Sequence, residues 1–168
     1  MTNRGKARRG GVLVETAMLL PIVIALLMGT VELARVTYTY YMLQKIMFTL
    51  ARYLGTQQGV NFCDGQDANV QAAINYAISG TTESADNPLV PGLTPSMFQI
   101  NIERYDPASG QIVPCDCSAA GCDASQGGRP PDFIVVSLTN YSVHPVFWGF
   151  AVDPFPLRPS VRVPYGGT

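Results

Sequence analysis

A long apolar run at residues 12–31 constrains this chain more than any other feature of its sequence. Glu15 is the only charged residue in the run. A helix rises about 1.5 Å per residue, so a helical run would extend roughly 30 Å, the thickness of the hydrocarbon core of a bilayer. Glu15 lies near the start, where a charge costs less to insert than at the centre. The run therefore predicts one membrane crossing; a buried central helix of a soluble protein is the alternative.

The residues before the run set the expected orientation. Residues 1–10 contain no acidic residue, although the whole chain has a formal net charge of −1. The basic residues of this segment are Arg4, Lys6, Arg8 and Arg9. Basic segments beside a membrane span stay in the cytoplasm, so we expect the N-terminus there and the chain after the span outside the cytoplasm. A cleaved secretory signal fits less well, because its apolar region is shorter and ends at a small-residue site.

The start of the run resembles a type IV prepilin processing site. In such sites a short basic leader ends in Gly, and a Glu stands at the fifth position of the mature helix; here Gly10, Gly11 and Glu15 occupy these places. The resemblance implies that residues 1–10 are a leader, which a prepilin peptidase removes by cutting between Gly10 and Gly11. It also implies that the Glu15 carboxylate pairs with the freed amine of a neighbouring subunit, a contact that is strong only where water is excluded. The alternative for Glu15 is that its side chain reaches the nearby membrane interface.

Residues 5–55 resemble the TadE family, the minor pseudopilins of tight-adherence (Tad) pili. The resemblance rests on residues 15–21 (Glu-Thr-Ala-Met-Leu-Leu-Pro) and 29–35 (Gly-Thr-Val-Glu-Leu-Ala-Arg). It implies a structural subunit of the bacterial inner membrane that takes part in Tad pilus assembly. The implied partners are other pseudopilins, the major pilin, the prepilin peptidase and the inner-membrane pilus assembly platform. An unprocessed, single-span anchor that carries an extracytoplasmic binding domain is the alternative function.

The helix is expected to continue beyond the membrane. Glu32 and Arg35, three residues apart, can form an ion pair at the outer end of a span assigned to residues 11–35; a solvated helix end is the alternative. Apolar residues then recur every three or four positions up to Gly55, a credible helix terminator. They are Val36, Tyr40, Leu43, Met47, Leu50 and Leu54. This pattern resembles the pilin plan, in which the second half of one long helix supports a globular head.

Residues 36–168 are expected to form that head, an α+β domain with a second helix and a small antiparallel sheet. Apolar spacing predicts the second helix at residues 70–78, with Asp67 as its N-cap and Gly80 just past its end. Alternating or β-branched segments then predict strands. The expected strands are residues 98–103, 111–113, 133–141 and 160–163.

All cysteines follow the predicted span, in a compartment that favours disulfides. They are Cys63, Cys115, Cys117 and Cys122. Three pairings are possible, and we favour Cys63 bonded to a cysteine of the 115–122 segment, because this closes a large loop. A site that binds metal through all of them is the alternative, but the paired C-x2-C spacing of structural zinc sites is missing. We expect no metal and no cofactor.

An aromatic segment at residues 144–156 precedes the last strand. Its rings Phe147, Trp148 and Phe150 either pack on the head's own sheet or form a docking surface for another pilin or for the membrane. The chain has one histidine, expected to be structural, and lacks the G-x-S-x-G, H-E-x-x-H and phosphate-loop motifs. The sequence therefore predicts no catalytic residue and no small-molecule substrate. The acidic balance after the leader argues against nucleic acid.

Overall fold

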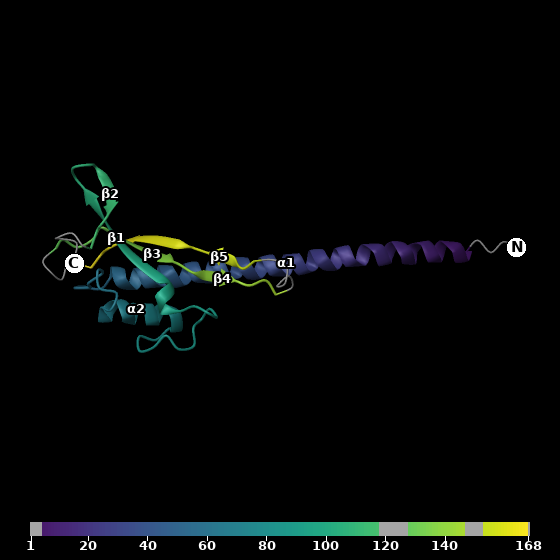
Figure 1. Ribbon diagram of the computed structural model, residues 1–168, viewed down its shortest axis with the longest axis horizontal. Helices are drawn as coiled ribbons and strands as arrows, with labels where there is room; N and C mark the ends of the chain where they lie inside the picture. The colour runs from purple at the N-terminus through teal and green to yellow at the C-terminus, as the bar shows by residue number, and fades with distance from the viewer. Residues whose placement is uncertain (1–4, 118–127, 147–152, 168) are drawn as a thin grey trace.

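One long helix, α1 (Gly5–Gly55), runs from the N-terminal end of the molecule into its head (Figure 1). The computed structural model describes residues 5–117, 128–146 and 153–167. Pro21 lies inside the helix. The helix ends at Gly55, as predicted, and Gly166 donates a backbone hydrogen bond of 2.9 Å to the carbonyl of Gly55. The predicted continuation of the helix from the apolar run into the head is confirmed.

The second half of α1 forms one side of the head's core. Its buried apolar residues are Leu43, Ile46, Met47, Leu50, Ala51 and Leu54. The predicted stripe was wrong at Tyr40, which is exposed and accepts a hydrogen bond of 3.2 Å from Gln44. A phenol tolerates this position because its hydroxyl stays in polar surroundings. Val36 is half-buried against the core.

The second helix, α2 (Ala68–Ser79), packs beside α1 and has the predicted caps. The Asp67 carboxylate accepts hydrogen bonds from the backbone N–H groups of Asn69 and Val70 at 2.8 and 3.3 Å. Gly80 follows the helix with φ of 83°, a conformation that glycine adopts without strain. The buried face consists of Val70, Ala73, Ile74, Ala77 and Ile78, the residues whose spacing predicted the helix.

A four-stranded antiparallel sheet packs against α1 in addition to α2, through β3 and β6. Its order is β2-β1-β3-β6, and a short 3-10 helix, η1 (Pro95–Met97), leads into it. The strands are β1 (Phe98–Asp106), β2 (Gln111–Pro114), β3 (Phe133–Leu138) and β6 (Ser160–Pro164). Residues Ile134, Val136 and Leu138 alternate along β3 and are buried. The end of β1 and all of β2 form a hairpin that projects from the body (Figure 1).

The single strand predicted at residues 133–141 is instead two strands, which belong to different sheets. Asn140 adopts φ of 60°, which breaks the extended backbone between β3 and β4 (Tyr141–Val143). Strand β4 then pairs with β5 (Phe155–Leu157). The sequence did not predict β5, which lies in the aromatic segment and contains a proline, a residue that sheets accept at their edges. The two strands run along α1 toward its exposed half (Figure 1).

The last described residues fold back onto the end of α1. The Tyr165 hydroxyl donates to the carbonyl of Gln57 at 2.7 Å, in addition to the bond between Gly166 and Gly55. A Cβ at Gly167 would collide with the carbonyl oxygen of Gln57, so only glycine fits this position without rearrangement. The C-terminal segment thus fixes β6 to the junction between α1 and the loop that follows it.

Candidate functional site

The first half of α1 is apolar and uncovered. Residues 11–31 are all exposed, and the most apolar stretch has a mean hydropathy of 2.3 with none of it buried in the molecule. In the part of the chain that the structure describes, α1 is the one helix long and apolar enough to cross a membrane. A core helix of a soluble protein would be covered by the rest of the fold, so the exposure favours a membrane anchor over that alternative.

Glu15 lies near the start of this uncovered half. Its side chain is exposed, and among residues 5–117, 128–146 and 153–167 none forms a hydrogen bond or ion pair with its carboxylate. The adjacent Thr16 hydroxyl instead donates to the carbonyl of Val12 at 2.8 Å, a bond within the helix. Gly10 and Gly11 both lie in the helix as well, and the cut between them stays a prediction.

Glu32 and Arg35 bind the loop that follows β4. Glu32 is only 7% exposed, and its Oε1 accepts a hydrogen bond from the backbone N–H of Val146. Arg35 donates from its guanidinium to the carbonyl of His144. We call these two side chains with the backbone of residues 144–146 the Glu32–Arg35 clamp. An ion pair between the two side chains stays a prediction.

The surroundings of the clamp keep the loop in place. Pro145 is buried, and Tyr141 at the start of β4 donates its hydroxyl to the carbonyl of Pro91 at 3.1 Å. Burial raises the pKa of Tyr141, and the nearby Arg35 cation partly opposes this shift. The second oxygen of Glu32, Oε2, is buried and has no hydrogen-bond partner among the residues that the structure describes. The sequence marked Glu32 and Arg35 as a pair at the end of the span, but it contained no signal for the distant loop that they bind.

A disulfide joins Cys63 to Cys117, with Cα atoms 5.4 Å apart. This bond links the loop after α1 to the segment after β2, and it agrees with the pairing favoured from the sequence. Cys115 is also disulfide-bonded, whereas Cys122 lies outside the described residues. Within the described ranges no cluster of His, Cys, Asp or Glu is arranged to hold a metal ion.

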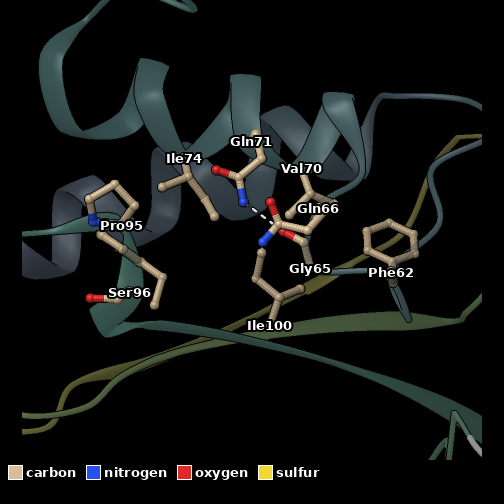
Figure 2. A pocket seen from close by; sticks show the side chains of 10 residues that line it. Phe62, Gly65, Gln66, Val70, Gln71, Ile74, Pro95, Ser96 and Ile100 are labelled. Atoms are coloured by element: carbon tan, nitrogen blue, oxygen red, sulfur yellow. Dashed lines mark hydrogen bonds between the residues drawn. The ribbon is translucent and has the colours of Figure 1, made fainter. Parts of the chain in front are cut away.

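A groove of about 390 Å³ lies between α2, η1 and β1 (Figure 2). Val70, Gln71 and Ile74 approach it from α2, and Ile100 lies on its opposite wall in Figure 2. The Gln71 side chain donates to the carbonyl of Gly65 at 2.6 Å across one end. None of the residues that line this groove is acidic or basic, so the groove offers no acid, base or charged ligand for catalysis.

The aromatic residues expected to dock a partner, Phe147, Trp148 and Phe150, lie outside the described residues. Their described neighbours on either side are exposed: Val146 at 62% and Phe155 at 45%. Both belong to the end of the β4–β5 sheet that the Glu32–Arg35 clamp attaches to α1. Exposed apolar side chains are therefore present both on the uncovered half of α1 and at this end of the head.

Comparison with known protein families finds a match to most of α1. The family described as TadE-like protein matches residues 10–52, which include Glu15, both clamp side chains and most of α1. No curated protein and no solved structure matches the chain. The long helix of this chain, from residue 10 to residue 52, is therefore similar to that of the TadE-like proteins, a family associated with the Tad pilus.

Proposed function

We propose that this protein is a minor pseudopilin that takes part in assembling a Tad-type pilus, as a structural subunit and not as a catalyst. One observation carries the proposal: the TadE-like match coincides with a helix whose first half is apolar and uncovered and carries a carboxylate close to its start. A surface of that kind is stable when lipid or other apolar helices cover it. The head then supplies a folded unit outside the bilayer.

The proposal divides the chain into three parts. Residues 1–10 are a basic leader, residues 11–35 span the bacterial inner membrane once, and residues 36–168 form the extracytoplasmic head. The basic leader supports a cytoplasmic N-terminus. The Cys63–Cys117 disulfide supports an oxidising, extracytoplasmic location for the head.

Subunit pairing is assigned to Glu15. A prepilin peptidase cuts after Gly10, and Gly11 then carries a free α-amine. The Glu15 carboxylate of one subunit pairs with the α-amine of its neighbour, and the low dielectric between packed helices makes this attraction much stronger than in water. The neighbours are other pseudopilins and the major pilin, and the inner-membrane assembly platform receives them.

Processing is tested by sequencing the N-terminus of the protein extracted from membranes, with and without the prepilin peptidase. The proposal expects Gly11 as the first residue when the peptidase is present and Met1 when it is absent. An intact Met1 under both conditions would instead support an anchored binding domain that is never processed.

Pairing is tested with Glu15→Gln and Glu15→Ala, compared with Glu15→Asp, which retains the charge. Both neutral variants should insert into the membrane normally, because removing a charge lowers the cost of insertion. We expect them to lose crosslinks to partner pilins, whereas Glu15→Asp keeps a substantial part of the yield. Equal crosslinking in all variants would remove Glu15 from the mechanism.

A further inference from the structure

We propose that the tip of the β4–β5 sheet lies in the headgroup layer of the membrane and contacts phospholipid, and that the Glu32–Arg35 clamp holds it there. The tip is defined here as residues 144–146 together with Phe155, which pairs with Val143 at the same end of the sheet. This inference rests on the membrane placement in the proposed function, and it assigns to the head a contact that the pilus role does not require.

The position of the tip along the membrane normal follows from the clamp. Glu32 comes directly after the apolar run, and it binds the backbone of Val146, while Arg35 binds the backbone of His144. Three helical residues rise about 5 Å, and the headgroup layer on one side of a bilayer is roughly 5–8 Å thick. A tip attached between Glu32 and Arg35 therefore lies within that layer when residues 12–31 fill the hydrocarbon core.

The exposed groups at this height fit a lipid surface. Leu33 is 68% exposed on α1, and Val146 and Phe155 are exposed on the tip, so both α1 and the tip present apolar side chains near the clamp. Apolar and aromatic side chains are favoured at the level of the headgroups. Attachment to α1 directly after its uncovered apolar half thus selects lipid as the occupant rather than a separate protein partner.

The clamp also explains how an acidic residue is accommodated at the end of the span. The Glu32 carboxylate is shielded by the tip and receives the N–H of Val146. A carboxylate facing the membrane boundary without such a donor would carry a larger desolvation penalty. Covering Glu32 and bringing the tip to the lipid are consequences of the same contact.

The test places a fluorescent label on the full chain in vesicles of phosphatidylethanolamine and phosphatidylglycerol. Val146→Cys carries an environment-sensitive nitrobenzoxadiazole group. Its quenching is measured separately with lipids spin-labelled on the headgroup, with lipids spin-labelled on the acyl chain and with an aqueous quencher. Ile112→Cys, an exposed apolar position on the projecting hairpin, is the matched control, and Leu20→Cys in the span reports on the anchor.

We expect the label at Val146 to lose most of its fluorescence to headgroup quenchers, whereas the label at Ile112 keeps the weak emission typical of water and is not quenched by them. If the two labels behave alike while acyl-chain quenchers reach Leu20, the lipid contact is overturned and the anchor stands. If no quencher reaches Leu20, the proposed membrane placement itself fails. A label at Val146 that is shielded from both lipid and aqueous quenchers indicates a protein neighbour, which also overturns the inference.

The clamp is tested in the same assay. Glu32→Ala removes the acceptor for the Val146 N–H, so the quenching at Val146 should fall to the level seen at Ile112. Glu32→Gln keeps an acceptor oxygen and should preserve most of the quenching. Circular dichroism of both variants confirms that the head is folded, and unchanged quenching in a folded Glu32→Ala protein would refute the role of the clamp.

Discussion

The Cys63–Cys117 disulfide allows the most quantitative prediction. Its cysteines are 54 residues apart in sequence, so the bond closes a large loop. In the chain-entropy account, closing a loop of this length removes about 14 cal/mol/K from the unfolded state, which corresponds to about 4 kcal/mol at 25 °C. Replacing both cysteines by serine should therefore lower the free energy of unfolding of the head by about this amount.

Urea unfolding of the detergent-solubilised chain, followed by near-ultraviolet circular dichroism, measures this loss. The double alanine variant is the control, because a loss caused by local packing depends on the replacing residue, whereas a loss caused by loop closure does not. A decrease below about 1 kcal/mol in both variants would refute the loop-closure reasoning. It would mean that residues 64–116 are already restricted in the unfolded chain.

Three further predictions concern the head. Leu50→Ala should lower the free energy of unfolding by about 2–5 kcal/mol in the same assay, because Leu50 is fully buried, whereas exposed Tyr38→Ala should change it by less than about 0.5 kcal/mol. Asp67→Ala should cost about 1 kcal/mol through loss of the α2 cap. The Ser109 hydroxyl lowers the pKa of Asp106, so this carboxylate stabilises the fold above its unfolded pKa, and the contribution is lost as the pH falls through the folded value. Ser109→Ala should raise that pKa in an NMR titration, and an unchanged titration would contradict the assignment.

The elements that follow from local pattern could be predicted from the sequence. The 3.6-residue periodicity and the caps at Asp67 and Gly80 gave α2 its ends, and alternation of apolar residues gave β1. Strand β5 has three residues and a proline, so its pairing with β4 carries almost no local signal. The break at Asn140 was missed although asparagine adopts the left-handed conformation more readily than most residues, because the β-forming residues on both sides outweighed this single signal.

In the candidate site, too, the features that depend on local sequence could be predicted and the long-range contact could not. The exposed helix and Glu15 follow from composition and spacing, since a membrane helix needs no partner elsewhere in the chain to be recognised. The clamp does not, because the Glu32 and Val146 groups that form a hydrogen bond are 114 residues apart in sequence. A helical spacing rule considers only neighbours within one turn, and it therefore relates Glu32 to Arg35 alone.

The way the final residues fold back onto α1 decides where this protein can be tagged. An affinity tag fused behind Gly167 would disturb a segment that is closely packed against Gln57 and that attaches β6 to the end of α1. The turn after Asp106 points away from the body, at the opposite end of the molecule from the exposed helix (Figure 1). An epitope inserted in that turn would stand clear of the folded head, without straining the junction between helix and head.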